Sequence, residues 1–118
     1  MSRFYARAVL HVADVQRAVD FYIGSLGFSE AWRHADDDRL LVAQVDRDGC
    51  ELILSCQWPE GRGHGLIFIS LDLDVMRAVR AEFEGRGVAV KDGNWGYKLM
   101  IVEDPDGNRL FFPYPNEG

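Results

Sequence analysis

The sequence predicts an α+β fold built from two consecutive β-α-β-β-β modules. The order of strand and helix patterns is the same in both halves, and a helix cap, an apolar stripe and a terminating glycine recur at one spacing. The recurring pairs are Asp14 and Asp74, Val15 and Val75, Ala18 and Ala78, Val19 and Val79, and Gly27 and Gly87. Such a repeat indicates an internal duplication. Because each module has one helix to cover one sheet face, we expect the other faces to form a curved sheet around a cavity.

The length of the chain sets the number of domains. Its 118 residues suffice for one domain with a hydrophobic core and are too few for two independent ones. We expect a single domain over residues 1–118, with a first module at about 1–56, a linker at about 57–64 and a second module at about 65–118. Apolar residues make up 47% and charged residues 27%, as in ordinary globular proteins.

Charge and composition narrow the range of partners. The net charge of −6 argues against nucleic acid or an anionic membrane, since either would require a basic patch. The same charge suits a cationic ligand, or it only keeps the protein in solution. No apolar run approaches the roughly 20 residues of a membrane span, and no signal-peptide core is recognisable, so we expect a cytoplasmic protein. Cys50 and Cys56 lack the spacing of a zinc site or a disulfide framework and are expected to be reduced.

The first module begins with a strand predicted from Arg3 to Val12. In it, one face carries Ala8, Leu10 and Val12 and the other carries Arg7, Val9 and His11. Asp14 is the expected N-cap of a helix, and Gly27 is expected to end it. The helix stripe and the strands that follow are Val15, Ala18, Val19, Tyr22 and Leu26, then Phe28 to His34, Arg39 to Val45 and Cys50 to Ser55.

The second module repeats this order after a Pro/Gly-bearing loop from Gln57 to Gly65. A strand is predicted from Leu66 to Leu71, and Asp74 is the expected cap of a helix that Gly87 ends. The helix stripe and the later strands are Val75, Ala78, Val79 and Phe83, then Val88 to Val90, Tyr97 to Val102 and Arg109 to Phe112.

The last two strands are predicted to form a hairpin through Asp104-Pro105-Asp106-Gly107-Asn108. Pro sets φ in such a turn, and Gly or Asn accepts positive φ. Alternation along the outgoing strand places Arg109, Phe111 and Pro113 on one face and Leu110 and Phe112 on the other. Both faces are largely apolar, so the strand either completes a core on one side and lines a pocket on the other, or serves only as core.

Four sequence motifs together resemble those of the vicinal oxygen chelate superfamily, which includes glyoxalase I, extradiol dioxygenases, fosfomycin-modifying enzymes and bleomycin-resistance proteins. They are Leu10-His11-Val12-Ala13-Asp14, Ala18-Val19-Asp20-Phe21-Tyr22, Leu26-Gly27-Phe28 and the turn Asp104-Pro105-Asp106-Gly107-Asn108. The resemblance covers nearly the whole chain and implies paired modules that commonly assemble as homodimers. It implies no single activity, because the family includes both metalloenzymes and binding proteins.

The resemblance also indicates where metal ligands of the family's enzymes would stand. Those positions hold Arg7, Gly65 and Phe111 here, and none of these side chains can donate a lone pair to a metal. A one-residue bulge could bring His64 into the second position. A single His would still fall short of the three protein ligands that a zinc site requires. We therefore expect no metal and no cofactor.

The segment Trp95-Gly96-Tyr97-Lys98, with the final hairpin, is similar to bleomycin-resistance-like proteins. This resemblance implies sequestration of a cationic or aromatic small molecule at a dimer interface. The ligand-binding residues we predict are Arg7, Val9, His11, Trp58, Trp95, Tyr97 and Phe111.

These residues have different expected roles. Arg7 in an apolar hollow would hold an anionic or carbonyl group, or it would form a structural salt bridge. Trp58 and Trp95 would offer stacking surfaces, whereas Trp32 would pack in the core or at a dimer contact. His11 is expected to be a hydrogen-bonded core histidine.

No catalytic residue is predicted, because nothing around Ser55, Cys56 and His64 has the order of a nucleophile and its base. The sequence therefore predicts a metal-independent small-molecule-binding protein. The alternative is a metal-dependent enzyme of the glyoxalase, dioxygenase or isomerase type that uses His64 or His11. A scaffold protein without a ligand is the third hypothesis.

Overall fold

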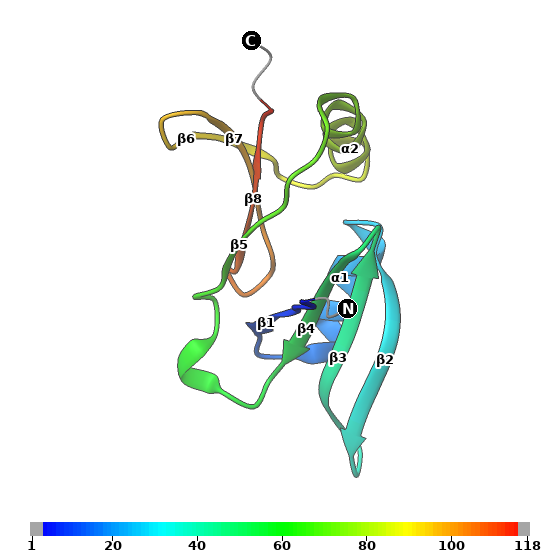
Figure 1. Cartoon of the computed structure of the whole chain (residues 1–118). Helices are drawn as coiled ribbons and strands as arrows, with labels where there is room; N and C mark the ends of the chain where they lie inside the picture. The colour runs from blue at the N-terminus through cyan, green and yellow to red at the C-terminus, as the bar shows by residue number, and fades with distance from the viewer. Residues whose placement is uncertain (1–3, 116–118) are drawn as a thin grey trace.

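The computed structural model describes residues 4–115 and contains two four-stranded sheets, each with one helix (Figure 1). Sheet A has the strand order β1-β4-β3-β2, and sheet B has the equivalent order β5-β8-β7-β6. In each sheet the first strand is parallel to its neighbour and the other pairs are antiparallel. The predicted α+β fold of tandem modules is thus confirmed.

The elements are β1 (Ala8–His11), α1 (Val15–Gly24), β2 (Ser29–Asp36), β3 (Arg39–Arg47), β4 (Cys50–Ser55), the 3-10 helix η1 (Pro59–Gly61), β5 (Leu66–Phe68), α2 (Leu73–Gly85), β6 (Lys91–Asn94), β7 (Lys98–Glu103) and β8 (Arg109–Pro113).

Three predicted strands differ from those observed by more than two residues at an end, or are absent. The strand expected from Arg3 begins at Ala8, and Arg3 itself lies outside the described residues. The strand expected from Leu66 to Leu71 ends at Phe68. The strand expected at residues 88–90 is wrong, because that segment has no regular structure and β6 follows it. β6 is a polar edge strand, Lys-Asp-Gly-Asn, and so lacks the apolar alternation by which strands are recognised.

Helix α1 confirms the predicted cap and stripe. The side chain of Asp14 accepts a hydrogen bond from the backbone N–H of Arg17 at 3.0 Å, which satisfies a donor at the first helical turn. The chain leaves the helix through Gly27 at φ +75°, a conformation that glycine adopts without steric cost. The buried residues of the helix are Val15, Ala18, Val19 and Tyr22.

Helix α2 begins at Leu73, earlier than predicted, so the predicted cap at Asp74 is wrong. Its N-cap is Asp72, which makes no side-chain cap bond. The buried stripe is Met76, Val79 and Phe83, so Val79 and Phe83 are confirmed and Met76 takes the place predicted for Val75. Val75 and Ala78 of the predicted stripe are exposed, Val75 by 45%. Burying Met76 instead of Val75 removes the larger apolar side chain from water.

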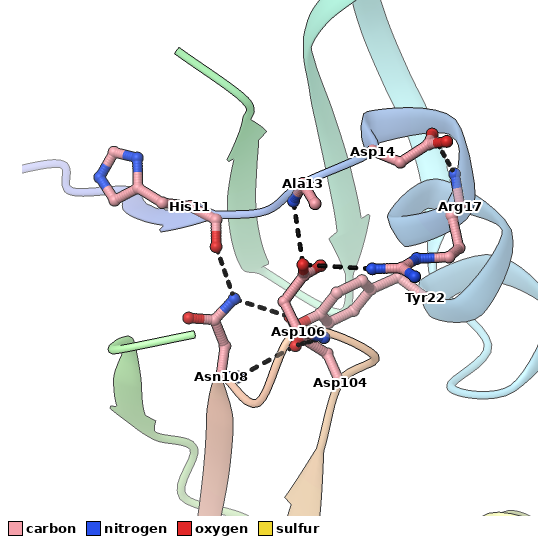
Figure 2. Close-up of polar contacts among 8 residues, drawn as sticks. All are labelled: His11, Ala13, Asp14, Arg17, Tyr22, Asp104, Asp106 and Asn108. Carbon is pink, nitrogen blue, oxygen red and sulfur yellow. Dashed lines mark hydrogen bonds and ion pairs between the residues drawn. The ribbon is translucent and has the colours of Figure 1, made fainter. Parts of the chain in front are cut away.

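The predicted turn between β7 and β8 is present, and it is a buried contact between the modules (Figure 2). The Asp104 carboxylate accepts hydrogen bonds from the Tyr22 hydroxyl at 3.1 Å and from the backbone N–H of Asn108 at 3.0 Å. Burial and the neighbouring Asp104 charge raise the pKa of Tyr22 well above its ordinary value, so the hydroxyl stays protonated and donates. We call this turn with its contacts to the first module the Asp104–Asn108 clamp.

Two further side chains of the clamp bind the backbone around β1. Asn108 is fully buried and donates from Nδ2 to the carbonyl of His11 at 3.0 Å, while its Oδ1 accepts from the N–H of Gly65 at 2.8 Å. Asp106 accepts a hydrogen bond from the N–H of Ala13 at 2.9 Å (Figure 2). The clamp therefore satisfies backbone groups at the end of β1, just after it and just before β5.

One hydrophobic core runs through both modules, joining side chains such as Leu10 and Tyr22 of the first to Phe83 and Phe112 of the second. α1 lies against one face of sheet A, and α2 stands beside sheet B (Figure 1). Each sheet thus has one covered face and one open face. The sheets are curved but do not close on each other. Neither helix among the described residues has the length and apolar character that a membrane span requires.

Candidate functional site

The open face of sheet B carries three aromatic rings in mutual contact. Phe68 and Phe111 are stacked, with ring centroids 5.7 Å apart and planes inclined by 19°. Trp95 meets both edge-on, at 5.4 Å from Phe68 and 5.3 Å from Phe111. We call Phe68, Trp95 and Phe111 the aromatic cluster. Such offset and edge-to-face arrangements are the favoured geometries of aromatic side chains.

Strand alternation and register place the two phenylalanines. Leu110 and Phe112 of β8 belong to the core, so Phe111, which alternates with them as predicted, points to the open face. Phe68 of β5 pairs with Phe111 in the parallel register and therefore lies beside it on the same face.

The β6–β7 turn places Trp95. Its backbone N–H donates to the carbonyl of Tyr97 at 3.0 Å, and the N–H of Gly96 donates to the side chain of Asn94 at 2.8 Å. Gly96 adopts φ +79°, which closes the turn without a Cβ clash. These hydrogen bonds fix the backbone of the turn that carries the indole.

Exposure within the aromatic cluster is graded. Phe111 is only 3% exposed, while Phe68 and Trp95 are 46% and 55% exposed. Tyr97, in the same turn as Trp95, is exposed as well. The Arg109 guanidinium lies 5.5 Å from the centre of the Phe111 ring, a cation–π distance. The cluster therefore offers a buried floor and two open ring surfaces to a flat ligand.

The open face of sheet A is polar and is organised by Gln44 of β3, which is only 4% exposed. Its Oε1 accepts hydrogen bonds from Arg7 Nη1 and Trp32 Nε1, both at 2.9 Å. Its Nε2 donates to Asp46 Oδ1 at 2.9 Å and to Glu51 Oε1 at 2.8 Å. Both amide hydrogens and both lone pairs are used, so this amide is fully satisfied.

Arg7 does not lie in an apolar hollow, as the sequence led us to expect. It is exposed, binds the Gln44 amide, and places its guanidinium carbon 5.5 Å from the ring centre of Tyr5. Tyr5 in turn donates a hydrogen bond to Glu51, and that bond is the main reason why the pKa of Tyr5 is raised. Side chains from β3 and β4 reach this face together, so the surroundings of Arg7 are polar.

His11 and Trp58 meet at the end of β1. Their rings are 4.8 Å apart and nearly perpendicular, and Trp58 is otherwise exposed. The Nδ1 atom of His11 is shielded from solvent and has no hydrogen-bond partner. The ring of His11 therefore does not show the side-chain hydrogen bond we expected. Val9 lies on the same strand and is exposed on the open face.

The three positions of the expected metal ligands do not fit a metal. A Cβ on Gly65 would lie 2.6 Å from the Leu10 side chain and 2.8 Å from Asn108 Oδ1, so this position faces the core. Phe111 belongs to the aromatic cluster, and Arg7 is bound to Gln44. His64 is exposed and is spaced two residues from Leu66 and four from Phe68, which are also exposed. Within residues 4–115, no three His, Cys, Asp or Glu side chains gather as a metal site would require.

The structure brings together some of the predicted ligand-binding residues and separates others. Trp95 and Phe111 touch each other, with Tyr97 in the same turn, whereas the other four belong to sheet A or the loop after it; these are Arg7, Val9, His11 and Trp58. Sequence reasoning missed Phe68 and Gln44. The alternation of Leu66, Ile67 and Phe68 could have revealed Phe68, and a lone polar residue within the apolar run of β3 was the only signal for Gln44.

The paired β-α-β-β-β modules, each with one sheet and one helix, form a fold that several solved structures share. The antibiotic-binding protein TnmS3 from Streptomyces sp. CB03234 is similar with 25% identity and a TM-score of 0.76, covering 98% of each chain. A bleomycin-binding protein from Streptomyces verticillus, solved with copper(II)-bleomycin, has 25% identity and a TM-score of 0.73, covering 98% of this chain and 100% of that one. A glyoxalase/bleomycin resistance protein from Streptomyces sp. CB03234 has 27% identity and a TM-score of 0.71, covering 93% and 99%.

The family model of the Glyoxalase/Bleomycin resistance protein/Dioxygenase superfamily matches residues 5–112. The chain belongs to this superfamily, which confirms the resemblance found in the sequence. No curated protein matches the chain significantly.

Proposed function

We propose that the protein is a metal-independent binding protein that sequesters a planar aromatic small molecule on the aromatic cluster of sheet B. The observation that carries this proposal is the exposure of Phe68 and Trp95 around the buried Phe111. Exposed rings that contact one another on a concave sheet form a stacking surface, because every aromatic ligand has a face to offer. Similarity to an antibiotic-binding and a bleomycin-binding protein supports a role in protection against such a compound.

The proposal extends to the assembly and the location of the protein. We propose a homodimer, because each chain leaves Trp32 40% exposed on the open face of sheet A, where a second copy would cover it. We propose a cytoplasmic location, which agrees with the acidic charge and the two unpaired cysteines. Light scattering on the purified protein measures the assembly, and a monomer at micromolar concentration would contradict the dimer.

The binding experiment uses proflavine, a planar aromatic cation, and follows its fluorescence on titration with protein. We expect saturable binding that weakens roughly fivefold in Trp95→Ala, because a stacked aromatic pair contributes about 1 kcal/mol. The matched control is Trp32→Phe, which alters an indole on the open face of sheet A and should leave the affinity within about twofold. Equal losses in the two variants would contradict the assignment of the site to sheet B.

Metal independence is tested on the same preparation. Treatment with a chelator should leave proflavine binding and the melting temperature unchanged, since the ligand positions hold Arg7, Gly65 and Phe111. Elemental analysis showing one tightly held divalent ion per chain, together with a large loss of stability on its removal, would overturn this part of the proposal.

A further inference from the structure

A cavity lies on the helix side of the molecule and borders the aromatic cluster at Phe68. It measures about 380 Å³ and opens between α2, the segment after β5 and the turn that joins β3 to β4. Its wall is largely apolar and includes Ile69, Val75, Val79, Phe83 and Phe112. The volume falls within the range of small-molecule sites, and a boundary between two packed units is where such sites concentrate.

The cavity arises from a difference between the two helices. α1 buries Val15, Ala18, Val19 and Tyr22, whereas α2 buries only Met76, Val79 and Phe83. Because Met76 and not Val75 is buried in the first turn of α2, Val75 remains 45% exposed at the cavity wall. A β-branched apolar side chain in this position leaves apolar surface that a ligand can cover.

The charged residues of the cavity wall are Arg47 and Asp48. Asp48 lies 3.8 Å from Arg47 Nε, and its side chain is 93% exposed, so its charge stays in solvent at the edge of the cavity. Arg47 donates from Nη1 and Nη2 to Glu82 at 2.9 and 2.8 Å, and also from Nη1 to the carbonyl of Leu26 at 2.6 Å. Its guanidinium is thus committed to joining the β3–β4 turn to α2. Burial raises the pKa of the Cys50 thiol, which keeps this side chain neutral. An ionic ligand would enter this wall without a partner and would lose its hydration.

We infer that this cavity binds a small neutral apolar molecule, at a site that shares Phe68 with the aromatic cluster but includes neither Trp95 nor Phe111. The inference does not depend on the proposed function, since none of its arguments uses Trp95 or Phe111. Cys50 lies in the wall and gives a direct measure of occupancy, because a molecule seated beside the thiol shields it from reagents.

The test uses indole as the neutral apolar molecule and the complete chain. Alkylation of Cys50 by N-ethylmaleimide is followed by peptide mass spectrometry, which separates Cys50 from Cys56. We expect indole at ten times its Kd to slow alkylation of Cys50 roughly tenfold and to raise the melting temperature. Val75→Trp should fill the cavity and abolish both effects. Ala78→Trp places the same ring on an exposed position of the same helix outside the cavity, and should preserve them.

Two further outcomes decide whether indole occupies this cavity. Trp95→Ala should leave the indole effects intact, and their loss in that variant would place indole on the aromatic cluster and overturn the inference. Light scattering is measured on Val75→Trp in parallel. Suppose that indole has no effect on the unsubstituted protein and that Val75→Trp is a monomer where the unsubstituted protein is a dimer. A second copy of the chain would then cover the cavity, and the inference would be overturned.

Discussion

The open faces of the two sheets have opposite chemistry on the same strand topology. Sheet A presents the Gln44 amide with every hydrogen bond made, surrounded by Arg7, Asp46 and Glu51. Sheet B presents the aromatic cluster, with two of its rings half-exposed. Equivalent strands in equivalent order therefore do not imply equivalent faces. A satisfied polar network has little left to offer a ligand, whereas uncovered rings retain a surface that water covers poorly.

A duplicated fold of this kind can vary on its open faces. Residues pointing to the core are apolar in both modules, and both sheets depend on the same Asp104–Asn108 clamp. Residues on the open faces do not have to be apolar or to bind the clamp, so their chemistry differs between the two modules. Substitutions in the clamp should consequently harm both faces, while substitutions on one face should harm that face alone.

The largest effect is expected from Asp104→Ala, which removes the feature that the two faces share. It leaves the Tyr22 hydroxyl and the N–H of Asn108 buried without acceptors, so we expect the free energy of unfolding to fall by about 3–4 kcal/mol. Urea denaturation measures the loss. Asp38→Ala, in the exposed β2–β3 turn, is the matched control and should change little. Similar stability of the two variants would show that the clamp is not an energetic link between the modules.

A smaller effect is expected from Gln44→Leu, which breaks the face of sheet A only. Arg7, Trp32, Asp46 and Glu51 all lose a partner, and we expect a loss of about 2 kcal/mol in the free energy of unfolding. Proflavine affinity should stay within about twofold, because the aromatic cluster is untouched. A loss of binding as large as that in Trp95→Ala would show that both faces form one site and do not act independently.

The smallest effect concerns pH. Hydrogen bonds from Arg47 hold the pKa of Glu82 below its ordinary value of 4.5, so the stabilisation from this pair is fully present above pH 4.5 and is lost as the pH falls through the lowered pKa. In Arg47→Gln the deficit in stability should therefore shrink between pH 6 and pH 3, by less than about 1 kcal/mol because the pair is partly solvated.

Chemical denaturation across this pH range measures that change. Arg39→Gln is the control for the pH experiment, since Arg39 forms no ion pair with another described residue and lies 3.9 Å from the sulfur of Cys56; its deficit should not change with pH. A constant deficit for Arg47→Gln over the whole range would show that the ion pair with Glu82 does not contribute to stability.

Local patterns in the sequence predicted much of this structure. The Asp14 cap, the β8 alternation that turns Phe111 away from the core and the turn at residues 104–108 are each decided by a few neighbouring residues, and the structure confirms them. The register of α2 was not decidable in this way, because stripes through Val75 and through Met76 both have helical spacing. Tertiary packing selected Met76.

The candidate site was only partly predictable for the same reason. Trp95 and Phe111 were identified, but their contact with Phe68 depends on the parallel pairing of β5 with β8. The Gln44 network needs side chains from three strands and the segment before β1, which no single stretch reveals. The reason for a glycine at position 65 was also not predictable from the sequence. Its lack of a side chain permits close packing against Leu10 and Asn108, which are distant in the chain.

The Asp104–Asn108 clamp also bears on how the chain is made. The hydrogen bond from Asn108 to His11 spans 97 residues, and that from Ala13 to Asp106 spans 93. During synthesis, β1 leaves the ribosome long before its partners exist, and the backbone groups beside it stay solvated until the final hairpin has emerged. The first module therefore reaches its finished state only after nearly the whole chain is available, and a nascent chain stalled before residue 104 exposes a half-completed core to chaperones and proteases.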